Sequence, residues 1–113
     1  MKATDLMIGD KVMVKVLSQI PNTYVLHTWT ANDYSRDIQV KPIPLTPEIL
    51  EKNGWWFNTE VMWQHYEVEF CIEKWKGRFQ CDDITDIKLD SVHQLQQTLR
   101  LCGLNELANN FKI

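Results

Sequence analysis

The sequence predicts an α+β fold in which a curved, mainly antiparallel sheet carries a short central helix and a C-terminal helix. Strand-like runs are joined by tight turns, and antiparallel pairing needs no helical crossover. Capping residues mark the start of a helix at two places. With 113 residues, 44% hydrophobic and 24% charged, the chain can bury a core of its own. A single domain over residues 1–113 is therefore expected.

Three strands are predicted in the first part of the chain. Lys11–Leu17 alternates valine with lysine and methionine, which is typical of a half-buried strand. Tyr24–Thr30 is rich in β-formers, Ala31–Asp37 is a polar loop, and Ile38–Ile43 ends at prolines. These strands are candidates for a small barrel-like unit.

The first helix is predicted over Pro47–Asn53. Thr46 is placed to cap the helix, and proline is favoured at the first helical position because its missing N–H is not needed there. Leu45 and Leu50 stand at the two positions of a hydrophobic staple. Gly54 is placed for a left-handed helix end.

Further strands are predicted after this helix. Trp55–Glu60 is a short candidate, and Val61–Trp75 is the longest, with an apolar and a polar face. Arg78–Cys81 would return as its hairpin partner, followed by Ile84–Leu89.

The C-terminal helix is predicted to start at Ser91, which forms a capping box with Gln94. Gly103 would end it, and a short turn would follow over Asn105–Ile113. The apolar stripe of the helix consists of Val92, Leu95, Leu99 and Cys102.

Composition and sequence pattern argue against several classes of protein. The net charge of −3 argues mildly against a general nucleic-acid binder, although it allows a local basic patch. The chain has no signal-peptide pattern and no apolar run long enough for a membrane span, which favours a cytoplasmic protein. Its three cysteines are odd in number and lack CxxC spacing, so we expect reduced thiols that mostly fill the core.

Three segments of the chain are together distinctive: DLMIGDKVMV, PIPLTPEILEKNGW and LDSVHQLQQTLRLCGL. This combination resembles a family of small uncharacterised proteins of gut bacteria and their phages or mobile elements. The resemblance spans both ends and the middle of the chain. It implies a bacterial or phage setting, and it carries no function, cofactor or catalytic residue.

The densest aromatic stretch supplies the candidate protein interface, Trp55, Trp56 and Trp63. Adjacent positions of a strand point to opposite faces, so Trp55 and Trp56 cannot both point inward. Exposed tryptophan is enriched in protein interfaces. We therefore expect one exposed ring and contact with a protein partner or a second copy.

The turn around Gly77 supplies the candidate nucleic-acid contact, Lys74, Trp75, Lys76 and Arg78. With Phe79, these residues make a basic tip with two aromatic rings, which could stack on single-stranded bases while its cations meet phosphate. The alternative is a soluble hairpin whose lysines protect a sheet edge.

The remaining clusters of polar residues give little indication of metal binding or catalysis. His65, Glu67 and Glu69 could begin a metal site on one strand face, but a solvated sheet face is favoured. His93 is expected to pack or cap, because no nucleophile with a supporting acid is evident near it. The sequence therefore favours a non-enzymatic protein-interaction module without metal or cofactor. A nucleic-acid-binding accessory protein that uses residues 74–79 is the alternative.

Overall fold

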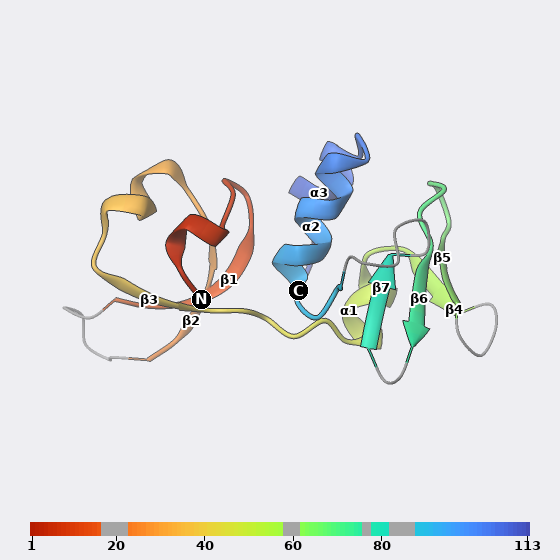
Figure 1. Cartoon of the computed structure of the whole chain (residues 1–113), viewed down its shortest axis with the longest axis horizontal. Helices are drawn as coiled ribbons and strands as arrows, with labels where there is room; N and C mark the ends of the chain where they lie inside the picture. Colours follow the sequence, from red (N-terminus) through yellow and green to blue (C-terminus); the bar gives the residue numbers. More distant parts are fainter. Residues whose placement is uncertain (17–22, 58–61, 76–77, 82–87) are drawn as a thin grey trace.

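The computed structural model describes residues 1–16, 23–57, 62–75, 78–81 and 88–113, with the side chain of Trp75 left out. Its two antiparallel sheets and its helices confirm the α+β class. The molecule measures 47 × 26 × 24 Å, with one sheet toward each end of the long axis and α2 between them (Figure 1). The helices are α1 (Pro47–Lys52), α2 (Val92–Leu101) and α3 (Asn105–Asn109), and the 3₁₀ turns are Ala3–Asp5 and Ala31–Ser35.

The N-terminal sheet has the order β2-β1-β3, with β1 at its centre. Its strands are β1 (Lys11–Val16), β2 (Val25–Thr28) and β3 (Ile38–Lys41). The expected alternation in β1 is confirmed, because Val12 and Val14 are buried against Leu6 and Trp29 in a small core. The described pairings all run through β1, so closure into a barrel stays a prediction.

The predicted polar loop after β2 is more ordered than its composition indicated. Residues 31–35 form a 3₁₀ turn whose buried Asp33 carboxylate accepts hydrogen bonds from the Thr30 N–H and hydroxyl, each at 2.8 Å. A local side-chain to backbone bond of this kind stabilises a turn as it does a helix start.

The C-terminal sheet has the order β4-β5-β6-β7. Its strands are β4 (Trp55–Phe57), β5 (Met62–His65), β6 (Ile72–Trp75) and β7 (Arg78–Cys81). The prediction of one long strand over Val61–Trp75 is wrong. The chain turns between β5 and β6, and these two strands pair with each other through Trp63 opposite Ile72. The expected hairpin of β6 and β7 is present, whereas residues 82–87 of the predicted last strand lie outside the described part.

The helix ends follow the sequence signals closely. Thr46 Oγ1 accepts the Ile49 N–H at 3.3 Å, and Gly54 has a φ of +94°. At the end of α2, the Leu104 N–H donates to the Leu99 carbonyl at 2.9 Å, which is the long bond of a Schellman motif. These contacts are local, which is why sequence spacing was sufficient to predict them.

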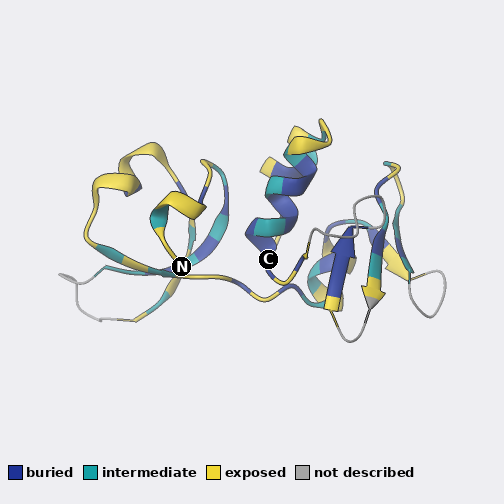
Figure 2. Ribbon diagram, in the orientation of Figure 1, coloured by how far each residue is buried: buried dark blue, intermediate teal, exposed yellow. Residues whose placement is uncertain are grey.

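Helix α2 contacts both halves of the molecule. The buried Val92, Leu95 and Leu99 join the larger core, which extends to the C-terminal sheet, α1 and Phe111 (Figure 2). The predicted fourth member of this stripe, Cys102, is exposed because the helix ends at Leu101. Of the other two cysteines, Cys81 is buried and Cys71 is half-buried, so core filling holds for Cys81 alone.

The other face of α2 binds the turn before β1 through polar side chains. Gln96 is fully buried: its Oε1 accepts the Lys11 N–H at 2.7 Å, and its Nε2 donates to the carbonyls of Gly9 and Ala108. Arg100 Nη1 lies 2.5 Å from Asp10 Oδ1. The two sheets are therefore joined through one helix that is apolar on one side and hydrogen-bonded on the other.

Candidate functional site

The three tryptophans of the predicted interface do not share a surface. Trp55 and Trp63 are 1% and 5% exposed and belong to the core, so both are removed from the candidate interface. The Trp55 indole N–H donates to the Phe70 carbonyl at 3.0 Å. Trp56 points to the opposite face of β4 and is 37% exposed, which confirms the expectation of one exposed ring.

Trp56 has a second exposed aromatic ring beside it. Tyr66, in the turn after β5, is 74% exposed, and its ring centroid lies 6.0 Å from that of Trp56 with an angle of 33° between the planes. We call these two residues the aromatic pair. Tyr66 was missed because the sequence placed it within a long strand. The turn exposes it next to β4.

A surface hollow of about 650 Å³ adjoins the aromatic pair. It lies on the outer face of the sheet, because Trp56 and Gln64 are register partners there. Glu69 brings a carboxylate to its lining. The lining residues are Trp56, Gln64, His65, Tyr66, Val68, Glu69 and Cys71.

His65 is engaged on both ring nitrogens. Its Nε2 lies 2.7 Å from the Asn53 carbonyl oxygen, and its Nδ1 lies 3.0 Å from the Glu67 backbone nitrogen. A carbonyl can only accept and a backbone N–H can only donate, so the neutral tautomer with hydrogen on Nε2 satisfies both contacts. The ring also packs edge-on against Trp55 at 4.7 Å between centroids.

The predicted row of metal ligands is not formed. His65 ends β5, whereas Glu67 and Glu69 lie in the following turn, so these residues do not alternate along one strand. Within the described ranges, no group of three or more His, Cys, Asp or Glu side chains is arranged to hold a metal ion.

The basic hairpin retains few free groups for phosphate. Arg78 forms a two-point ion pair with Asp90, with the guanidinium Nε 3.0 Å from Oδ1 and Nη2 in contact with Oδ2. This pairing lowers the pKa of Asp90 and raises that of Arg78. Phe79 is buried in the core, and Lys74 is exposed. Lys76 and the Trp75 side chain lie outside the described part of the chain.

Two residues at the start of α2 form a contact that the sequence analysis missed. Ser91 Oγ lies 3.0 Å from His93 Nδ1, and both side chains are buried. Burial lowers the pKa of His93, although Asp10 and Asp5 act in the opposite direction. No carboxylate among the described residues forms a hydrogen bond with this imidazole. The serine-to-histidine spacing of two residues was the signal available in the sequence.

Asp33 is the centre of a second contact network, in the N-terminal sheet. Its carboxylate is 1% exposed and lies 2.7 Å from His27 Nε2 and 2.8 Å from Arg36 Nη1. Burial alone would raise the pKa of Asp33, but the hydrogen bonds from His27, Thr30 and Arg36 together hold it well below its ordinary value. The network fixes the turn after β2.

No family model, curated protein or solved structure matches this chain. Among the helices of the described residues, none is long and apolar enough to cross a membrane. The candidate site therefore rests on its own geometry: the aromatic pair and the carboxylate-bearing hollow beside it.

Proposed function

We propose that this protein is a non-enzymatic interaction module that binds a basic segment of a protein partner on the aromatic pair and the adjoining hollow. The observation that carries the proposal is the exposure of Trp56 and Tyr66 side by side, at 37% and 74%. Large aromatic rings contribute most of the binding energy in many interfaces. The phage or mobile-element setting that the resemblance implies is part of the same proposal.

The part of the chain that carries the pair contains an excess of carboxylates, which favours a basic partner. Residues 42–113 contain eleven carboxylates and seven lysines or arginines, whereas residues 1–41 contain four and five. Glu69 lines the hollow itself. Aromatic faces attract ammonium and guanidinium groups, and nearby carboxylates strengthen that attraction and steer the approach.

The sheet edge offers a second element of recognition. Strand β4 pairs only with β5 among the described strands, which makes it an edge strand of the sheet. An extended peptide can add to such an edge while its side chains enter pockets beside it. Trp56 belongs to this edge strand, so one peptide could contact both.

The nucleic-acid alternative on the hairpin has weaker support. Its arginine is already paired with Asp90 and one of its two rings is in the core, which leaves Lys74 as its exposed cation in the described residues. Self-association through the aromatic pair is an alternative outcome of the test below.

The proposal is tested by affinity capture from the native host with wild-type protein and with the double variant Trp56→Ala/Tyr66→Ala. We expect the double variant to lose a nuclease-resistant partner, and a peptide scan of that partner to locate binding in a Lys- or Arg-rich segment. Leu101→Ala is the matched control, because Leu101 is 81% exposed on a different element.

Sedimentation of both variants separates the alternatives. If the wild type forms a concentration-dependent dimer and Trp56→Ala/Tyr66→Ala abolishes it, the occupant of the aromatic pair is a second copy of this chain and not another protein. Partner capture that both variants retain equally would show that the aromatic pair is not the interface.

A further inference from the structure

One face of the N-terminal sheet gathers cations around an aromatic ring. The pairing register places Lys15 opposite Gln39, and Met13 opposite both Leu26 and Lys41. These side chains share one face of the sheet, because alternate residues of a strand point the same way. The other face carries the buried Val12 and Val14 of the small core. On the cationic face Met13 packs against the larger core, whereas Lys15 is half-buried and Lys41 is exposed.

Tyr24 lies across this face. Its ring centroid is 4.4 Å from Lys41 Nζ and 5.2 Å from Lys15 Nζ, and its hydroxyl contacts Gln39 Oε1 at 3.5 Å. The two ammonium groups are therefore less than about 10 Å apart. Leu26, 52% exposed, adds an apolar surface on the neighbouring strand.

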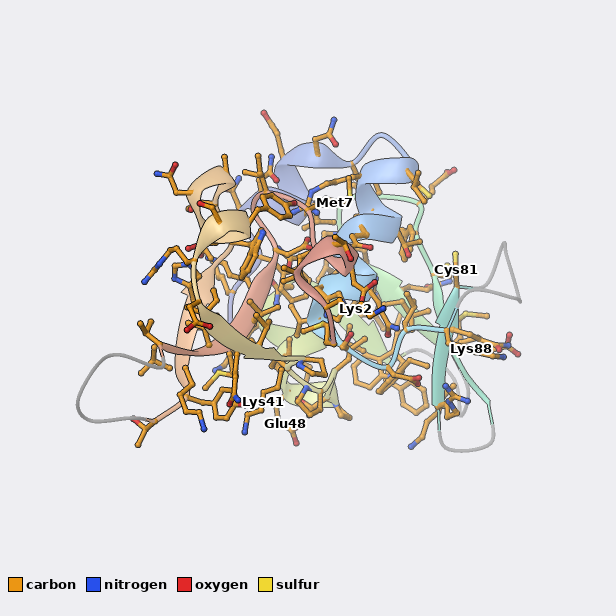
Figure 3. The ribbon with its side chains drawn as sticks, turned by 60° about the vertical axis from the view of Figure 1, so that its left-hand side comes forward. Lys2, Met7, Lys41, Glu48, Cys81 and Lys88 are labelled. Atoms are coloured by element: carbon orange, nitrogen blue, oxygen red, sulfur yellow. The ribbon has the colours of Figure 1, made fainter. Side chains whose placement is uncertain are left out.

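Lys15 and Lys41 have no carboxylate partner in the described part of the chain. Among the described residues no ion pair involves Lys15 or Lys41, and the strands themselves bring no Asp or Glu to this face. Asp37 precedes β3, and Glu48, which is labelled together with Lys41 in Figure 3, belongs to α1 and forms no ion pair with that lysine. Two like charges that converge without a counter-charge favour an anion between them.

Two of the four carboxylates in residues 1–41 are turned inward. Asp10 and Asp33 are buried and paired with Arg100 and Arg36, whereas Asp5 and Asp37 are exposed. Residues 1–41 contain five lysines or arginines against these four carboxylates, so the net charge of −3 comes from the rest of the chain. The face around Tyr24 is locally positive, because its strands bring lysines and no carboxylate to it.

We propose that this face binds single-stranded nucleic acid, with Lys15 and Lys41 on phosphate oxygens and the Tyr24 ring stacked on a base. Either lysine can leave the ring for a phosphate, which frees a ring face for a base. Stacking on aromatic rings above a cationic surface is how proteins bind single strands without reading their sequence, and bases in a duplex are not accessible to it. A hollow of about 410 Å³ adjoins Tyr24 along β3. Gln39 and Arg36 bring polar groups for a base edge to its lining, and Ala3, Ile38 and Val40, which pack against the small core, also line it.

This surface differs from the predicted hairpin and from the aromatic pair, so it is tested separately. The probe is a fluorescein-labelled oligothymidylate or oligouridylate of about 12 nucleotides, within the site sizes usual for single-strand binders. Binding is followed by fluorescence anisotropy between about 50 and 300 mM salt, because each phosphate contact contributes roughly 0.7 to the salt slope.

We expect the wild-type protein to bind both probes. Lys15→Gln/Lys41→Gln should weaken binding roughly tenfold or more and lower the salt slope by about 1.4. Tyr24→Ala should also weaken it roughly tenfold at unchanged slope, whereas Tyr24→Phe keeps the ring and should bind like the wild type. All substituted side chains are at least partly exposed, and circular dichroism verifies that each variant is folded.

Lys52→Gln/Lys74→Gln is the matched control, because it removes the same charge from α1 and from the hairpin. Equal loss of binding in this control would assign any binding to general charge or to the hairpin and overturn the proposal. The absence of binding by the wild type at about 100 μM protein and about 50 mM salt would also overturn it. Displacement of the probe by polyglutamate at equal charge would assign the face to acidic protein instead.

Discussion

The two sheets of this protein are held in place by different interactions. Among the described residues, the C-terminal sheet shares a core of fifteen buried residues with α1, α2 and the C-terminal segment, whereas the core beside the N-terminal sheet contains four. The smaller core is supplemented by two buried carboxylates, Asp10 and Asp33, each bonded to several donors. A sheet that is too small to be held in place by apolar burial can therefore be held by buried polar groups that are satisfied by hydrogen bonds.

The largest expected effect lies in the larger core. Leu99→Ala removes a fully buried side chain and should lower the free energy of unfolding by about 4 kcal/mol, measured by urea denaturation. Leu101→Ala, two residues away and 81% exposed, should change it by less than about 0.5 kcal/mol. Similar losses in both variants would contradict the assignment of the core face of α2.

The next effect lies in the polar joint between α2 and the N-terminal sheet. Arg100→Leu leaves the buried Asp10 without its ion partner and should cost about 3 kcal/mol. Hydrogen exchange should show that residues 7–11 lose protection before β5 and β6 do. Arg36→Leu is the control, because Arg36 is 41% exposed and should cost only about 1 kcal/mol. Uniform loss of protection would mean that the two halves unfold as one unit.

A glycine next to His65 tests the packing of the C-terminal sheet. A Cβ on Gly54 would lie 2.6 Å from His65 Nε2, and its φ of +94° is unfavourable for alanine, so Gly54→Ala should cost about 2 kcal/mol. Gly103→Ala has a similar φ with nothing within 4 Å of the added Cβ, so it should cost about 1 kcal/mol. Thermal unfolding of the two variants isolates the clash with the imidazole, and a shared Tm would exclude it.

A smaller effect is expected at the cap of α1. Thr46→Ala removes the acceptor of the Ile49 N–H and should lower stability by about 1 kcal/mol, measured by chemical denaturation. Thr46→Ser keeps the hydroxyl and should remain within about 0.5 kcal/mol of the wild type. A serine variant as unstable as the alanine variant would assign the loss to the methyl group of threonine.

The smallest effect concerns Asp33: it is absent at neutral pH and appears only in acid. The folded pKa of Asp33 lies below its unfolded value, so its contribution is complete above the unfolded pKa of about 3.9 and declines as pH falls toward the folded pKa. We expect amide signals of β1–β3 to broaden below about pH 4 before those of β5–β7, as followed by NMR. Asp33→Asn should remove this difference, and its persistence in that variant would point to another carboxylate.

Local sequence signals predicted the helices well and the second sheet only in part. The caps at Thr46 and Gly54 involve neighbours within four residues, so their spacing was sufficient. The strand over Val61–Trp75 was wrong because its turn depends on distant partners. His65 bonds to Asn53, and Trp55 bonds to Phe70, so residues on both sides of the turn between β5 and β6 are held by the segment around β4.

The candidate surfaces, too, were predicted where they depend on local signals and missed where they depend on distant residues. Alternation correctly indicated that Trp55 and Trp56 point to opposite faces, but the choice of the exposed ring depends on which face meets the core. The arginine of the hairpin, Arg78, is paired with Asp90, a residue twelve positions away. The cationic face around Tyr24 was not predicted, because its residues come from three strands.

Sequence alone was sufficient to predict the α+β class, the caps of α1 and α2, and the two faces of β1, because each depends on neighbours a few residues apart. The folded chain was needed to show that Gln96 and Arg100 join the two halves, that Trp56 and Tyr66 are exposed together, and that Lys15 and Lys41 meet at one ring. These arrangements depend on pairing register and on competition for buried space, and these are properties of the whole chain.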